Sequence, residues 1–223
     1  MVCPNPGLVE QWLADRVLAC PIVGCGGHLG PWGWAKPRQV WTSFRSRGDS
    51  LGVTPRRGRC FLCGRTQVLL DQRFLSRRCN ALAVITQELE LAARGLGARK
   101  IAVIQARPIS TVRDRLRTAR KVAPLVIQAV GQVVQLVAAD AGSLVPMVSS
   151  NVLADLVRGL AGLATALGWS SSTDWLMAGA SVCRSQILCP SWWATRAQHE
   201  FALTGLGVVK PGWMGGQKVS GPP

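Results

Sequence analysis

The chain has 223 residues, of which 48% are hydrophobic, so it can bury a core and is not disordered throughout. Its 26 Lys and Arg residues outnumber its 11 Asp and Glu residues, which gives a net charge of +15. Residues 1–120 hold 20 of the basic and seven of the acidic residues, so this half alone carries +13. Because arginine guanidinium groups match phosphate oxygens, the first half is predicted to bind a polyanion.

Residues 7–18 are predicted to form a short helix that leads into the first of two cysteine turns. Asn5 and Pro6 are typical of a helix start, and apolar residues then recur at intervals of three and four. These residues are Leu8, Val9, Trp12, Leu13 and Val17. The helix therefore has one apolar face.

Two cysteine pairs are predicted to bind one metal ion. Four residues separate Cys20 from Cys25, two separate Cys60 from Cys63, and a glycine follows each pair. Turns of this kind can direct both thiolates at one ion, as tetrahedral zinc requires. His28, three residues after Cys25, is the alternative ligand and could replace Cys20 or Cys25. Four thiolates leave no position open for water, so such a site stabilises a fold and hydrolyses nothing.

Eight cysteines could instead form the disulfide bonds of a secreted protein. Residues 1–6 contain neither the basic region nor the long apolar stretch of a signal peptide. The protein is therefore predicted to be cytoplasmic, where thiols stay reduced and paired cysteines favour a metal.

Residues 18–79 are predicted to form a zinc ribbon of short strands and loops, closed by a strand at 66–70. Between the cysteine pairs the segment carries large aromatic residues among Lys and Arg. These are Trp32, Trp34, Trp41 and Phe44. A sheet folded over a zinc ion has little core of its own, so packing is their expected role, and stacking on a nucleic-acid base is the alternative.

Residues 80–121 are predicted to form three short helices. The first begins near Asn80 and ends at Gly95, and the second covers 98–105 and ends before Pro108. The residues expected to face inward from these two helices are Leu82, Ile85, Leu89, Ala92, Ile101, Ala102 and Ile104.

The third helix is predicted to run from Ser110, whose hydroxyl can cap it, to about Lys121. Val112 and Leu116 give it one buried stripe. Its other faces carry Thr111, Arg113, Asp114, Arg115, Arg117, Arg120 and Lys121. A proline-bearing turn before a basic third helix is what a helix-turn-helix needs to read DNA, and an ordinary bundle with solvated charges is the alternative. The net charge and the adjoining ribbon favour DNA.

Residues 122–168 are predicted to form two apolar helices with a break at 141–146. Three glutamines interrupt the first helix and Asp140 ends it, so packed helices or a homodimer surface are expected, not a membrane span. Residues 169–223 show no clear periodicity, and the glycine- and proline-containing end from Lys210 is expected to be a flexible tail. The fold class expected for the whole chain is mostly α with a small β ribbon.

Several of these motifs follow one another in a specific order. They are Cys20-Pro21 and Cys25-Gly26, Trp32-Gly33-Trp34, Arg59-Cys60 and Cys63-Gly64-Arg65-Thr66 with Val68-Leu69-Leu70, and Arg99-Lys100-Ile101-Ala102 ahead of Pro108-Ile109-Ser110-Thr111-Val112-Arg113. In this order, residues 18–121 resemble the zinc-ribbon plus helix-turn-helix proteins related to the N-terminal, DNA-binding part of bacterial insertion-sequence transposases. The resemblance implies that the ribbon binds zinc and that the helix-turn-helix binds DNA.

The chain departs from that family at three points. Its upstream pair has four residues between the cysteines where the family usually has two. Gln105 stands where the second helix usually buries a leucine, and Ala106 where the turn usually has a glycine.

Transposase catalysis needs a cluster of carboxylates that holds two divalent metals, and this sequence does not offer one. After residue 121 the acidic residues are Asp140, Asp155, Asp174 and Glu200, and tyrosine is absent. The expected function is therefore binding of double-stranded DNA without a catalytic core, so the protein is not expected to be an enzyme.

The residues expected to contact DNA fall into two groups. Phosphate contacts are expected from Arg56, Arg57, Arg59, Arg65, Arg77, Arg99 and Lys100. Ser110 is also expected to contact DNA. Base contacts are expected from the first two exposed turns of the third helix, through Thr111, Arg113, Asp114 and Arg117.

Two other functions remain open from the sequence. In one, zinc only holds the first half together, and the helices of 122–168 bind a partner protein or a membrane surface. In the other, the ribbon binds RNA, with its tryptophans stacking on single-stranded bases.

Overall fold

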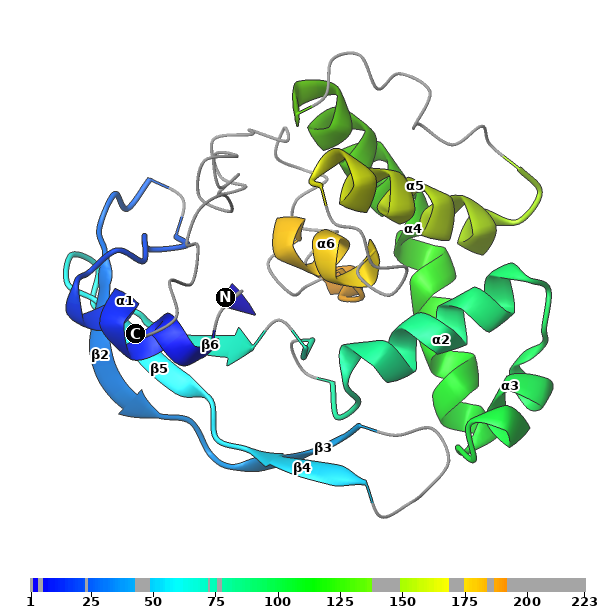
Figure 1. Cartoon of the computed structure of the whole chain (residues 1–223), viewed down its shortest axis with the longest axis horizontal. Coiled ribbons are helices and arrows are strands. Elements are labelled where there is room, and N and C mark those ends of the chain that lie inside the picture. The colour runs from blue at the N-terminus through cyan, green and yellow to red at the C-terminus, as the bar shows by residue number, and fades with distance from the viewer. Residues whose placement is uncertain are drawn as a thin grey trace, which may run out of the picture.

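The computed structural model describes residues 2–3, 6–22, 24–42, 49–71, 73–75, 78–137, 149–168, 175–183 and 187–191. Figure 1 shows the strands and the first helix at one end of the molecule and the remaining helices at the other. The expected class, mostly helical with a small sheet that carries the cysteines, is confirmed. The predicted DNA contact Arg77 and the tail from Lys210 lie outside the described residues.

The ribbon consists of a small sheet and a separate pair of strands. The sheet has the order β1-β6-β5-β2, from β1 (Val2–Cys3), β6 (Thr66–Asp71), β5 (Arg56–Cys60) and β2 (Leu29–Trp34). β5 lies antiparallel to both β2 and β6, and β1 lies parallel to β6. β3 (Arg38–Trp41) and β4 (Ser50–Val53) pair with each other and extend beyond the sheet (Figure 1).

One helix packs on this sheet. The turn Pro6–Leu8 leads into α1 (Val9–Ala14), which is shorter than the helix predicted at 7–18. The reason is Arg16, whose φ of 54° is left-handed and cannot continue a helix. The small core between α1 and the sheet contains Val9, Leu13, Leu29, Cys60 and Leu69.

The other described helices are α2 (Leu82–Ala93), α3 (Ala98–Ile104), α4 (Ile109–Val137), α5 (Val152–Ala166) and α6 (Trp175–Val182). The end predicted near Lys121 for the third helix is wrong, because α4 continues unbroken to Val137. Its buried stripe passes that point through Ala119, Val122, Ala123 and Val126. Pro124 lies inside the helix with its ring exposed, on the side away from this stripe. The boundary between 80–121 and 122–168 therefore falls within one helix.

One hydrophobic core joins these helices. It contains the apolar residues predicted to face inward from α2, the stripe of α4, and Leu153, Leu156, Leu160 and Leu163 of α5. Residues 122–168 thus show the packed helices that were one of the two alternatives, and their apolar faces are buried within the chain. Among the described helices, none combines the length and the apolar character that crossing a membrane requires.

The end of α3 differs from the prediction. Ile104, expected to face inward, is 44% exposed. Gln105 takes the inward position, one turn after the buried Ile101, and its side-chain amide donates to the Val84 carbonyl over 3.2 Å. Ala106 then adopts a φ of 48°, which reverses the chain toward α4.

A buried ion pair connects α2 and α4. Arg115, predicted on an exposed face, is buried; it donates to the Glu88 carboxylate and, over 2.9 Å, to Asn80 Oδ1. The prediction failed because α2 covers this side of α4 and supplies the countercharge. Burial raises the pKa of Glu88 to about 7, although the positive charge of Arg115 opposes this shift.

Candidate metal centre

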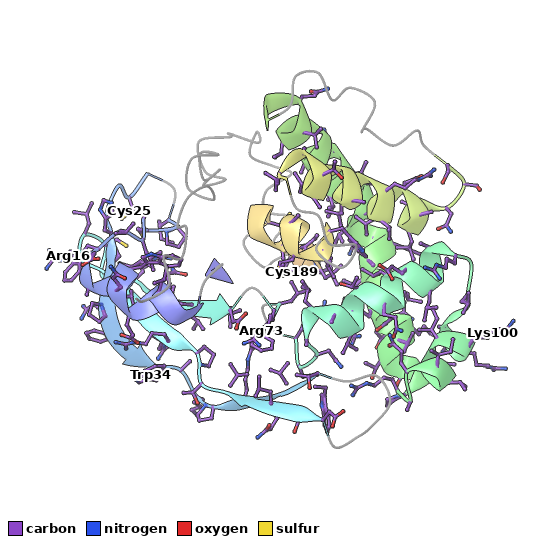
Figure 2. All side chains as sticks on the ribbon, viewed as in Figure 1. Arg16, Cys25, Trp34, Arg73, Lys100 and Cys189 are labelled. Atoms are coloured by element: carbon purple, nitrogen blue, oxygen red, sulfur yellow. The ribbon has the colours of Figure 1, made fainter. Side chains whose placement is uncertain are left out.

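Four cysteine sulfurs converge in the ribbon, at the end of the molecule away from α2 to α6, where Figure 2 labels Cys25. The Sγ atoms of Cys20 and Cys63 are 3.8 Å apart, those of Cys25 and Cys60 are 3.6 Å apart, and all four lie within 4.8 Å of one another. A tetrahedral ion with four bonds of about 2.3 Å needs sulfurs about 3.8 Å apart. The four predicted ligands therefore come together in a group that could hold a metal ion.

Glycines shape the two turns that carry these sulfurs. Gly26 and Gly64 follow the two pairs with φ values of 64° and 68°, which glycine adopts without strain. The Gly64 N–H donates to the Cys60 carbonyl over 3.0 Å and closes the second turn. At Gly27, a Cβ would lie 2.7 Å from the Cys60 sulfur. Any larger residue there would push into the sulfur group.

The thiols of the group differ in acidity. The backbone N–H of Cys63 lies 3.5 Å from Cys60 Sγ and donates to it, and with the N–H of Leu62 it lowers the pKa of Cys60 to about 7. Burial, together with the neighbouring thiols, raises the pKa of Cys20 to about 12. The Cys60 thiolate forms readily, whereas Cys20 needs a cation beside it to stay deprotonated. Metal binding therefore releases protons, and the affinity falls as the pH falls.

The rival ligand His28 does not join the sulfurs. It is exposed, and its backbone forms an isolated bridge with Ala19. None of the cysteines whose side chains the structure describes is in a disulfide. An ion held by these four sulfurs would have a complete tetrahedral shell, which suits a structural role and not catalysis on a bound water.

The ribbon arginines predicted to contact phosphate have different environments. Arg56 is engaged within the chain, where its Nε donates to the Glu10 carboxylate over 2.6 Å. Arg57 is partly buried, and Arg59 and Arg65 are exposed. Of the four, Arg59 and Arg65 are the most accessible to a ligand.

The remaining predicted DNA contacts lie on α3 and α4. All of them are exposed: Arg99, Lys100, Ser110, Thr111, Arg113, Asp114 and Arg117. Arg117 forms an ion pair of 3.3 Å with Asp114. Figure 2 labels Lys100 at the opposite end of the molecule from Cys25. The predicted residues thus form two separate surfaces, one on the ribbon and one on the helices.

Packing is the wrong interpretation for two of the ribbon tryptophans. Trp32 is 52% exposed and Trp34 is 60% exposed. An arginine guanidinium lies over each ring, with Arg59 at 4.4 Å from the centroid of Trp32 and Arg56 at 4.8 Å from that of Trp34.

Sequence reasoning missed a third aromatic group of this kind. Phe61 is 60% exposed, and the Arg16 guanidinium lies 4.2 Å from its ring centroid. Its position between Cys60 and Cys63 was a usable signal, because those two side chains point toward the metal centre and leave the residues between them outside.

Comparisons of the chain with models of protein families, with curated proteins and with solved structures give no match. A function for this chain is therefore inferred from its own residues and their geometry.

Proposed function

We propose that this chain is a zinc-stabilised protein that binds duplex DNA, related to the DNA-binding part of insertion-sequence transposases and without a catalytic core of its own. The observation that carries the proposal is the tight reversal between α3 and α4. Ala106, where the family usually has glycine, adopts the left-handed φ of 48° that glycine would supply. α4 then begins three residues later with exposed polar side chains.

The surface of α3 and the first turns of α4 is basic. It exposes Arg99, Lys100, Arg113, Arg117, Arg120 and Lys121. Arg113 and Asp114 follow Ser110 by three and four residues, and Arg117 follows them by four and three, so the four residues share one side of α4. A helix that presents such a side can enter the major groove, where arginine donates two hydrogen bonds to guanine. The surrounding cations would bind the phosphates.

Zinc is the metal proposed for the four-cysteine group. Four thiolates in a tetrahedral arrangement suit zinc or iron, and zinc needs no redox partner to serve a structural role. The resemblance to zinc-ribbon proteins supports the same choice.

Two buried carboxylates of the helices have partners within the chain. Asp155 accepts from the Ser149 N–H and pairs with Arg158, and Glu88 pairs with Arg115. Catalysis with two metals needs carboxylates that converge on the same ions. Within the described residues, the group that could hold a metal consists of the four cysteines.

Replacing Arg113 and Arg117 together by Ala is expected to weaken binding to a duplex of about 20 base pairs at least tenfold. Each lost base contact is worth about 1–3 kcal/mol, and each lost charge also weakens phosphate binding. Gel-shift titration at one fixed salt concentration measures the change.

The matched control is Lys36→Ala with Arg94→Ala. It removes the same charge from exposed positions outside the proposed surface and is expected to change the affinity less than threefold. Equal losses in both variants, or unchanged binding after the Arg113 and Arg117 changes, would contradict the assignment of α4 as the reading helix.

A further inference from the structure

The sheet of the ribbon has one face covered by α1 and one that is not. At Gly58, a Cβ would lie 2.9 Å from Leu13 Cδ2, so this position of β5 faces α1. Successive residues of a strand face opposite sides. Arg59 therefore faces the side away from α1, and so does Gly30, its partner in the register of β2 and β5.

Two aromatic rings lie on this uncovered side. A Cβ at Gly30 would collide with the Phe61 ring, so the ring lies directly over this glycine. The guanidinium of Arg59 lies over Trp32, two residues further along β2, which places Trp32 on the same side. Arg16 lies over Phe61. We call Trp32, Phe61, Arg16 and Arg59 the outer stacking surface.

The outer stacking surface is built like a ligand site. Trp32 and Phe61 are each more than half exposed, although burying their rings would stabilise the fold. Neither Arg16 nor Arg59 forms an ion pair with a carboxylate among the described residues. Aromatic rings interleaved with arginines are what proteins use to stack unpaired bases while they neutralise the strand that carries them.

We propose that the outer stacking surface binds single-stranded DNA, with unpaired bases stacked on Trp32 and Phe61 and phosphates held by Arg16 and Arg59. A duplex keeps its base faces inside its own stack, so rings on a sheet surface can use only unpaired bases. The choice of DNA over RNA rests on the proposed function. Arg16 and Lys100 lie at opposite ends of the molecule in Figure 2, so the ribbon and the α3–α4 surface can each hold a different part of one substrate.

The test compares two ligands and two sets of variants by fluorescence anisotropy. The ligands are a labelled oligo-dT of about 12 nucleotides and a labelled duplex of about 20 base pairs. Loss of one stacking ring weakens binding about tenfold, so Trp32→Ala with Phe61→Ala is expected to weaken oligo-dT binding about a hundredfold. Duplex affinity is expected to stay within twofold of the parent protein.

Trp34→Ala is the matched control. Trp34 is another exposed tryptophan of β2 under an arginine, but the register of β2 and β5 shifts between Pro31 and Gly33, so it does not share the side of Trp32. Its partner in the register is Arg56, which bonds to Glu10 of α1 and so faces the covered side. The control is expected to leave oligo-dT affinity within twofold. Phe61→Ala alone, at the tip of an exposed turn, is measured in parallel so that a folding defect of the double variant does not decide the result.

Three results would overturn the proposal: oligo-dT binding unchanged in Phe61→Ala and in the double variant, an equal loss in Trp34→Ala, or oligo-rU bound tenfold more tightly than oligo-dT. The two proposals also fail separately. A protein that binds oligo-dT through Trp32 and Phe61 but no duplex contradicts the proposed function alone, and duplex binding without oligo-dT binding contradicts the outer stacking surface alone.

Discussion

Removal of the metal ion from the four-cysteine group is expected to unfold the ribbon while the helices stay folded. The ribbon has two small hydrophobic clusters: one contains Val9, Leu13, Leu29, Leu69 and the proposed ligand Cys60, and the other contains Val40, Phe74 and Ala81. Clusters this small cannot offset the conformational entropy of the segment, whereas a structural zinc contributes about 10–16 kcal/mol. The core of α2 to α6 shares no residue with them, so the helical signal is expected to persist.

Metal analysis and limited proteolysis check this result. The purified, reduced protein is expected to contain one zinc per chain, and a chelator is expected to expose cleavage sites within residues 18–79 before any in α2 to α5. Cys60→Ser is expected to abolish the zinc. Cys79→Ser, which changes an exposed cysteine outside the group, is expected to keep it. A zinc content that Cys60→Ser leaves unchanged, or a ribbon that resists protease after chelation, would contradict the metal centre.

Arg115→Met is expected to lower the free energy of unfolding by about 3–5 kcal/mol. The substitution removes the partner of a fully buried carboxylate and leaves Glu88 uncompensated between α2 and α4. Arg117→Met, two residues away on the same helix but exposed, is the matched control and is expected to change stability by less than about 0.5 kcal/mol. Urea unfolding at pH 7.5 measures both.

A second substitution, at Glu88, tests whether the uncompensated charge of this carboxylate causes the loss of stability in Arg115→Met. Glu88→Gln combined with Arg115→Met removes the charge and is expected to recover at least half of the loss. If the double variant is no more stable than Arg115→Met, the loss comes from packing and the interpretation of the ion pair is wrong.

The Glu88 carboxyl also makes the stability of the folded protein depend on pH. The pKa of Glu88 is raised from 4.5 to about 7 in the folded protein, so the folded state binds its proton more tightly than the unfolded chain does. The stability that this proton contributes is fully present below about pH 4.5 and is lost as the pH rises to 7. In Arg115→Met the opposing positive charge is gone and the pKa of Glu88 rises further, so the destabilisation is expected to grow as the pH rises above about 7. Glu88→Gln is expected to remove that dependence.

The features predicted best from sequence were those fixed by local chemistry. Cysteine pairs followed by glycine leave few geometries open, so the four sulfurs were placed without any knowledge of the sheet. The apolar stripes of α2 and α5 follow from helical periodicity, because each helix buries one side in the same core.

The features predicted poorly depend on which neighbour covers a residue. Arg115 lies in a polar stretch of sequence, so its side chain was predicted to be exposed. It can be buried because Glu88 of α2 supplies a negative charge beside it. Gln105 takes the inward position that was predicted for Ile104, and its amide donates to the Val84 carbonyl of α2, a contact between helices that the periodicity of α3 alone does not reveal. Trp32 lies uncovered because α1 packs on the other face of the sheet, which no pattern within β2 reveals.

Duplex DNA binding by the basic surface of α3 and α4 is tested most directly by measuring affinity against salt. Four exposed cations there are assigned to phosphates, namely Arg99, Lys100, Arg120 and Lys121, and about four phosphate contacts predict a loss of about a hundredfold between 50 and 200 mM monovalent salt. Gel-shift titration of the zinc-loaded protein with a duplex of about 20 base pairs measures this dependence. A steep, linear fall of log affinity with log salt is the predicted result. An affinity that changes less than twofold over this range, or no binding at 50 mM, would contradict it.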